Sequence, residues 1–311
     1  MRLNSFGKNQ KSFSCILASD LHGNVHHYNT LKNIIVKERA SFVFFAGDLL
    51  PKDGGLWYPG NTVRTIQTQR MFLENFLIGY LQKLGEYAFI YAIFGNDDFR
   101  SNYDLIRKIG KNVRFLNNEV TRLPIPNQEF YLAGYPKIAL TPFLQKDWEQ
   151  WDETVGVSHK TCKLEGYDSY EGTHHPISFK NNNDGRATIT SELVKLAHES
   201  DPKKTLYLIH EPPFNTPLDQ IAINNPYEKN GVVHVGSKAI RTFIETQKPF
   251  LTMHGHIHET FHESGSFRWD CGKSISVTPS HNYKDKMLSY IMFDLPGLNT
   301  ITRYTQDAPT W

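Results

Sequence analysis

Five short apolar runs in this sequence each end at a residue that can bind a metal ion. The side chains at these ends are carboxylates, an amide and imidazoles. Because no thiolate is among them, they suit Mn, Fe or Zn in a catalytic site better than a structural zinc site. Two ions in one site need a carboxylate that bridges them, and Asp48 is the candidate. The candidate ligands are Asp20, His22, Asp48, Asn96, His210, His256 and His258.

Glycines adjoin three of these candidate ligands. Gly47 precedes Asp48, Gly95 precedes Asn96, and Gly255 precedes His256. A residue without a side chain lets the backbone turn sharply or approach an ion closely. The pattern therefore indicates tight loops around a small site.

The elements that must position these residues follow the rhythm of an α/β fold, in which short apolar runs alternate with helical patterns. Strands are predicted at residues 13–19, 42–46, 88–94, 129–133, 205–209, 249–253, 274–278, 287–294 and 299–304, and helices at 29–39, 62–84 and 237–247. In open α/β sheets, ligands bind beyond the carboxyl ends of the strands. The five ends can therefore converge although they are far apart in sequence.

The rhythm weakens between residues 136 and 200, where the sequence predicts a long irregular insertion. Such a segment in a compact domain is usually a functional lid or a loop. Trp148 and Trp151, with Trp57 and Tyr58, either stack on a nucleobase or pack in the core or the lid. We expect one domain, residues 1–311, with this insertion.

The order of the motifs resembles the calcineurin-like metallophosphoesterases. Their pattern is DxH, GD, GN, a lone His and GHxH, and the match extends from Asp20 to His258. A smaller resemblance, from His210-Glu211-Pro212-Pro213-Phe214 through Leu218-Asp219 to His234-Val235-Gly236-Ser237, is to a bacterial and archaeal branch of the family. The resemblance implies an α/β fold with a central β-sandwich flanked by helices and a dinuclear metal site at the carboxyl ends of the strands.

The resemblance also implies how two divalent or mixed-valence ions of Mn, Fe or Zn are held. Asp20, His22 and His258 would bind one ion, and Asp48 would bridge the two. The ligands of the other ion would be Asn96, His210 and His256.

The expected activity is metal-dependent hydrolysis of phosphate esters. Two cations roughly 3.5–4 Å apart can lower the pKa of a shared water, so that a metal-bridging hydroxide attacks phosphorus in line. The substrate is expected to be a small phosphate ester.

One departure from the family pattern concerns the residue after Asn96. Many members have His there, whereas this chain has Asp97. A carboxylate at this position repels a phosphate dianion, which favours a phosphodiester over a phosphomonoester. The catalytic candidates are Asp97 itself and, as replacement proton donors, His281 and His234.

Composition excludes several other classes. The 34 Lys and Arg residues nearly balance 32 Asp and Glu, so the net charge of +2 does not indicate a nucleic-acid partner, although a groove assembled in three dimensions would not be visible in the sequence. Three widely spaced cysteines suggest neither a disulfide framework nor a thiolate site. No apolar run suits a signal peptide or a membrane span, so we expect a cytoplasmic protein with no membrane partner.

Two alternatives stay open. One is a phosphomonoesterase. The other is a metal-binding regulatory or scaffold protein with little turnover, prompted by Asp97 and by the predicted insertion. Function depends on the site and its substrate contacts, so family resemblance alone does not choose between them.

Overall fold

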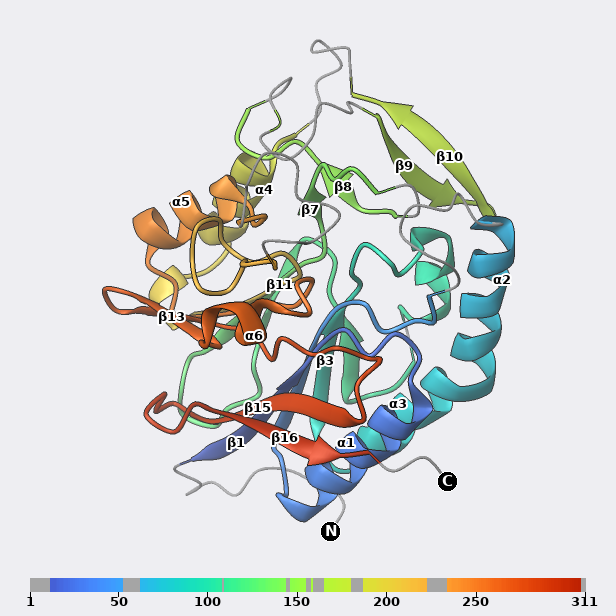
Figure 1. Cartoon of the computed structure of the whole chain (residues 1–311). Coiled ribbons are helices and arrows are strands. Elements are labelled where there is room, and N and C mark those ends of the chain that lie inside the picture. Colours follow the sequence, from blue (N-terminus) through green and yellow to red (C-terminus); the bar gives the residue numbers. More distant parts are fainter. Residues whose placement is uncertain are drawn as a thin grey trace.

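The chain folds into two β-sheets packed face to face with helices on both outer sides, as the computed structural model in Figure 1 shows. The structure describes residues 12–52, 62–107, 109–143, 146–154, 158, 165–179, 187–222 and 234–308. Over these residues, each of the two large sheets has six strands. The predicted α/β class and the implied β-sandwich flanked by helices are confirmed.

The first sheet combines strands from the two ends of the sequence, in the order β16-β15-β1-β2-β3-β4. Its strands are β1 (Phe13–Ala18), β2 (Phe42–Ala46), β3 (Phe89–Ile93), β4 (Val113–Phe115), β15 (Met287–Leu295) and β16 (Thr302–Asp307). The strands from β1 to β4 pair in parallel, so their carboxyl ends share one edge.

The second sheet has the order β13-β14-β12-β11-β6-β5. Its strands are β5 (Glu119–Arg122), β6 (Tyr131–Tyr135), β11 (Thr205–Ile209), β12 (Leu251–Met253), β13 (Arg268–Cys271) and β14 (Ser274–Val277). The strands β6, β11, β12 and β14 are parallel neighbours, which again directs their carboxyl ends to one edge.

The inner faces of the two sheets form one apolar core. Phe42 and Phe44 on β2 point into it and meet a layer that includes Leu206 and Leu208 from β11. Val43 and Phe45 point to the other side of β2 and belong to the core under the helices. Because both faces of this strand are buried, its sequence is a continuous apolar run.

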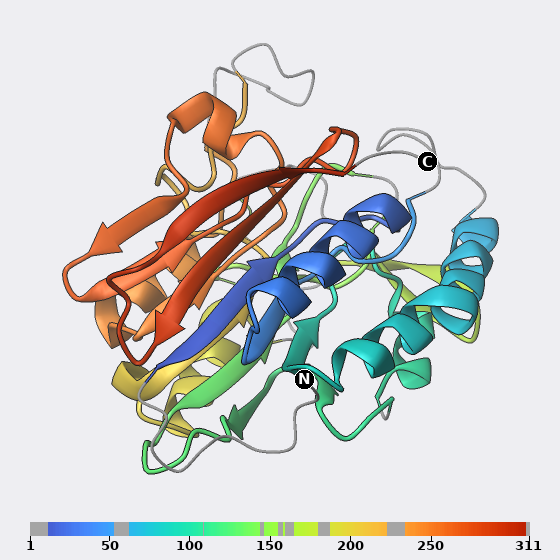
Figure 2. The ribbon, with the colours of Figure 1, turned by 90° about the horizontal axis from the view of Figure 1, so that it is seen from below.

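Helices cover the outer faces, and Figure 2 shows α1 lying along the first sheet. On this side lie α1 (Val25–Lys37), α2 (Thr62–Phe72) and α3 (Ile78–Leu84), the last two joined by a π-helical turn, Leu73–Leu77. On the other side, α4 (Ile189–His198) and α5 (Lys238–Gln247) bury apolar residues against the second sheet. The remaining helices are short: α6 (Thr260–Ser264) and 3-10 turns at Arg100–Leu105 and Pro202–Lys204.

The prediction of an irregular segment from residue 136 to 200 was wrong about its secondary structure. This segment contains β7 (Ile138–Ala139), β8 (Glu149–Gln150), β9 (Glu165–Tyr170), β10 (Thr173–Ser178) and α4. The helix α4 has a capping box at Thr188, and its apolar side packs in the core. The polar residues before α4 obscured its short apolar stripe in the sequence. Trp148 and Trp151, the two tryptophans of the segment from residue 136 to 200, are buried. Trp57 and Tyr58 lie outside the described residues.

Most other predicted elements are confirmed with small changes at their ends. The strand β6 begins later than predicted, at Tyr131, and β16 extends beyond the predicted end to Asp307. The strands β4, β5 and β13 were not predicted, because each has only three or four residues and includes charged side chains. Among the residues described, no helix is both long enough and apolar enough to span a membrane.

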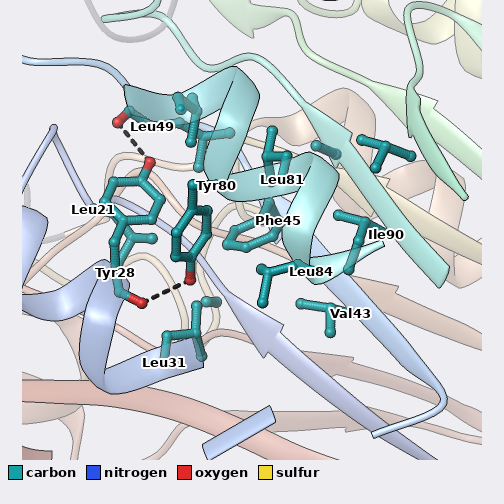
Figure 3. Close-up of a cluster of buried hydrophobic side chains, with 14 of the residues drawn as sticks. Leu21, Tyr28, Leu31, Val43, Phe45, Leu49, Tyr80, Leu81, Leu84 and Ile90 are labelled. Atoms are coloured by element: carbon teal, nitrogen blue, oxygen red, sulfur yellow. Dashed lines mark hydrogen bonds between the residues drawn. The ribbon is translucent and has the colours of Figure 1, made fainter. Parts of the chain in front are cut away.

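Two tyrosines connect the helical layer to the loop that follows β2. Figure 3 shows Tyr28 on α1 donating a hydrogen bond to the carbonyl of Leu49 (2.8 Å), and Tyr80 on α3 donating to the carbonyl of Tyr28 (2.7 Å). Both hydroxyl groups lie among apolar side chains. Because Leu49 directly follows Asp48, this chain of bonds holds a loop that carries a candidate ligand.

We predict that Tyr28→Phe lowers the free energy of unfolding by about 1 kcal/mol, because it removes one of the two buried hydrogen bonds that the carbonyl of Leu49 accepts, the other coming from the N–H of Gly23. Urea unfolding followed by circular dichroism measures this change. Tyr304→Phe is the control, since Tyr304 is 43% exposed and the expected change is within about 0.5 kcal/mol. Equal stability of the two variants would contradict the prediction.

Candidate metal centre

The loops after β1 and β2 are joined by a ladder of backbone hydrogen bonds. The N–H groups of Asp20, His22 and Gly23 donate to the carbonyls of Gly47, Asp48 and Leu49, each at 2.9 Å. The ladder continues the parallel pairing of β1 with β2 past the ends of these strands. It therefore holds Asp20 and His22, on the loop after β1, beside Asp48 on the loop after β2.

Several residues in these loops have left-handed backbone conformations. Asp20, His22, Asp48 and His256 have φ angles of 56°, 41°, 53° and 72°. Such angles are uncommon outside glycine and cost free energy, so they persist only where the surroundings enforce them. Four of the seven predicted ligands thus share a conformation that is typical of functional sites.

The predicted ligands lie together in two groups at the carboxyl ends of the strands. In one group, ligand atoms of Asp20, His22, Asp48 and His258 all lie within 4.8 Å of one another. In the other, Asp48, His210 and His256 meet the same limit. Asp48 belongs to both groups.

Asn96 adjoins the second group through its side-chain oxygen. This Oδ1 atom lies 3.1 Å from Nε2 of His210. The structure therefore brings together all seven residues that the sequence analysis selected as ligands.

The two oxygens of Asp48 have different surroundings. Oδ1 accepts a hydrogen bond from the N–H of Asp97 at 2.9 Å. Oδ2 lies 3.7 Å from Nε2 of His22 and 3.4 Å from Nε2 of His210. Burial opposes ionisation of Asp48, but His210 and His22 outweigh it and hold the pKa of Asp48 well below its usual value. The carboxylate is therefore charged and faces both groups.

The donor set fits metal ions. Oδ2 of Asp20 is buried and has no hydrogen-bond partner, while Oδ1 accepts the N–H of His256 at 3.0 Å. The Nε2 atoms of His22 and His258 face each other at 3.2 Å. Burial lowers the pKa of His22, so its imidazole is neutral and can offer a lone pair. A cation between these atoms would satisfy all of them.

A hydrogen bond at Nδ1 of His210 orients the ring so that Nε2 can bind a metal ion. Nδ1 lies 2.7 Å from the carbonyl of Ala46 and must donate to it, which leaves Nε2 as the nitrogen with a lone pair. Burial disfavours the imidazolium form, but Asp48 favours it and raises the pKa of His210 to about 9. A metal ion that binds Nε2 would therefore displace the proton held there. His254, which precedes the GHxH pair, is instead structural, because its ring nitrogens contact backbone carbonyls and Thr252.

Two buried polar side chains hold the loops that carry Asp48 and Asn96. Asp98 accepts hydrogen bonds from the N–H groups of Leu49, Leu50 and Gly95 at 2.7–3.1 Å. Gln69 on α2 donates to the carbonyl of Asp97 at 2.6 Å. These contacts confirm that Asp98 orients its neighbours.

Asp97 lies beside the centre but faces a lysine that the sequence analysis did not select. Nζ of Lys52 forms an ion pair with Oδ2 of Asp97, and both side chains are largely buried. The only signal in the sequence was that Lys52 follows Asp48 by four positions, on the loop after a ligand-bearing strand. The repulsion expected from Asp97 is therefore offset by a cation.

His281 is fully buried, and both of its ring nitrogens have protein partners. Nδ1 accepts the N–H of Ser289 at 3.3 Å, and Nε2 lies 3.0 Å from Nδ1 of His27. Nε2 of His27 in turn lies 3.0 Å from the carbonyl of Asp285. This chain of bonds ties the loop after β14 to α1.

His234 is partly exposed, and Asp219 orients its ring. Nδ1 of His234 lies 2.7 Å from Oδ1 of Asp219, whose side chain also accepts the N–H groups of Asn215, Thr216 and Gly236. Asp219 thus joins the described residues of the smaller sequence resemblance that lie on either side of it. The roles of His234 and His281 as proton donors stay predictions.

Gly95 is required by the close approach of two loops. A Cβ atom at this position would lie 2.2 Å from Oδ1 of Asp48 and 2.5 Å from Nε2 of His210. These contacts are too short, and either side chain would have to move.

We predict that Gly95→Ala weakens Mn²⁺ binding at least about 10-fold, because it displaces Asp48 or His210. Isothermal titration of the metal-free protein measures the affinity. Gly79→Ala is the matched control, since nothing lies within 4 Å of its Cβ position in α3 and Mn²⁺ affinity should not change. Unchanged affinity in Gly95→Ala would contradict the proposed closeness of the loops.

Comparisons with known proteins identify the fold and the family. One solved structure, 13% identical, aligns with a TM-score of 0.60 and covers 96% of this chain and 100% of its own. TT1561 of Thermus thermophilus, 12% identical, aligns with a TM-score of 0.56 over 96% of this chain and 100% of its own. At these identities the likeness concerns the fold alone. No curated protein matches the sequence. The family model of the calcineurin-like phosphoesterases matches residues 13–260, and the chain belongs to this family.

Proposed function

We propose that this chain hydrolyses phosphate esters, preferably phosphodiesters, at a centre of two metal ions bridged by Asp48. The position of Asp48 in both ligand groups is the observation that carries the proposal. Asp20, His22 and His258 would hold one ion, and Asn96, His210 and His256 the other. When bound, two such ions lower the pKa of a water molecule and neutralise charge on the phosphoryl group. We propose Mn, Fe or Zn, because the donors are carboxylate, amide and imidazole.

The charges of the surrounding residues support a singly charged substrate. The negative charges of Asp20, Asp48 and Asp97 would partly neutralise two divalent cations, and Lys52 would add one positive charge. The small positive charge that remains suits an attacking hydroxide and a phosphodiester monoanion together. A phosphomonoester dianion would leave an excess of negative charge in a buried centre, which is unfavourable.

His234 is our candidate for protonating the leaving oxygen. Its contact with Asp219 leaves Nε2 as the nitrogen that can face a ligand, and the ring is partly exposed. This arrangement suits a general acid oriented by a carboxylate.

The cysteines support our proposal that the protein is cytoplasmic. Cys15 and Cys271, two of its three cysteines, are free. Free thiols are typical of a reducing compartment.

The first test is turnover of a chromogenic phosphodiester, bis(p-nitrophenyl) phosphate, beside p-nitrophenyl phosphate. The protein is stripped of metal and then supplied with Mn²⁺. We expect faster cleavage of the diester and loss of both activities without metal. Faster cleavage of the monoester would refute the proposed substrate class but not the metal centre.

A protein that binds two metal ions and cleaves neither ester would instead be the regulatory or scaffold protein considered as an alternative. A broader ester panel at full metal occupancy separates this outcome from a poor choice of substrate. Asp97 in place of a histidine is the feature that keeps this alternative worth testing.

We predict that Asp48→Asn abolishes tight binding of the metal pair and lowers turnover by at least about 100-fold, because an amide is a poor bridging ligand. Metal content after dialysis, measured by plasma mass spectrometry, and turnover should fall together. Asp104→Asn is the control, since the Asp104 side chain is 89% exposed. Two tightly bound ions in a folded Asp48→Asn protein would refute the bridging role.

A further inference from the structure

Lys52 places a positive charge inside the metal centre. It lies on the loop after β2, four positions beyond Asp48, and its side chain is only 10% exposed. Nζ pairs with Oδ2 of Asp97, whose own N–H binds Asp48. One contact therefore separates the ammonium group from the proposed bridging carboxylate.

The surroundings of Lys52 place it on the side of the centre formed by His22 and His258. It interacts electrostatically with His22, Asp48 and Tyr283. The ring of Tyr283 packs against His22 at 4.4 Å and against His258 at 5.8 Å between ring centroids. The backbone carbonyl of Tyr283 is held by the side chain of Asn24 at 2.8 Å. Lys52 and Tyr283 thus border the same group of candidate ligands.

The ammonium group has the charge and the donors to bind an anion. Burial disfavours the charged form, but Asp97 and Asp48 more than compensate and raise the pKa of Lys52. An ammonium group has three donors, and Asp97 occupies one of them. A charged, positioned and largely buried donor beside a metal centre suits the stabilisation of charge on a phosphoryl group.

We propose that Lys52 binds the phosphoryl group of the substrate on the His22 and His258 side of the centre, and that Asp97 is a positioning residue that holds Lys52 there. This inference rests on the proposed function. It gives Asp97, the acidic residue after Asn96, a role. Lys52 carries the positive charge on the loop after β2, and the carboxylate of Asp97 holds its ammonium group in position. Lys52 would be a catalytic residue, because it touches the substrate.

The test compares Lys52→Met with the natural protein in the Mn²⁺-loaded form. We expect kcat/KM for bis(p-nitrophenyl) phosphate to fall about 100-fold. Inorganic phosphate should bind about 10-fold more weakly in isothermal titration, while two Mn²⁺ ions remain bound. Phosphate binding does not depend on turnover, so it reports on Lys52 directly.

Two further variants separate a contact with substrate from a structural role. Lys137→Met is the matched control, because Lys137 pairs with Glu192 in another part of the protein and its loss should leave phosphate binding unchanged. Lys52→Arg keeps a cation and donors at the position and should recover much of the phosphate affinity.

The double variant Lys52→Met/Asp97→Asn decides whether Lys52 only neutralises Asp97. It removes both charges, so the net charge of the pair is preserved while the donor is lost. Weak phosphate binding in the double variant supports the proposal, and recovery to the natural level overturns it. Natural phosphate affinity in Lys52→Met also overturns it. If the natural protein binds phosphate through Lys52 but cleaves no ester, the proposed function fails and the phosphate site stands.

Discussion

The carboxylate of Asp48 has to serve two groups of ligands at once, and the architecture around it follows from that constraint. One oxygen is held by the N–H of Asp97, so the other is directed toward His22 and His210. These partners come from both sheets, because His22 follows β1 and His210 follows β11. The sandwich must therefore bring the carboxyl ends of parallel strands from both sheets to one edge. This requirement explains why the candidate ligands are spread from residue 20 to residue 258.

The loops at this edge are held in unfavourable backbone conformations by rigid surroundings. Asp48 has a left-handed φ angle, and the residues after it are fixed by Asp98 from one side and Tyr28 from the other. Asp98 satisfies buried N–H groups that would otherwise be costly, and Tyr28 gives the carbonyl of Leu49 a second donor beside the N–H of Gly23. Preorganisation of this kind reduces the rearrangement needed when a cation enters. The apolar helix layer is thus part of the support for a polar site.

Much of this arrangement could be predicted from the sequence, because strand ends are easy to recognise when both faces of a strand are buried. The apolar runs before Asp20, Asp48 and His210 predicted both their strands and their meeting point. The ion pair of Lys52 with Asp97 could not be predicted, since it joins two irregular loops whose relative position depends on tertiary contacts. Likewise, α4 was missed because its short apolar stripe follows a polar stretch. The partners of His281 depend on how α1 packs, which periodicity does not specify.

The pairing of β1 with β15 has a consequence for the way the protein is made. Residues 13–17 bond to residues 291–295, so one edge of β1 has no partner until β15 has left the ribosome. An unpaired strand edge readily joins another chain, and contacts this distant in sequence form slowly. We therefore expect the nascent chain to depend on chaperones until β15 arrives, and refolding from denaturant to be limited by aggregation at high concentration.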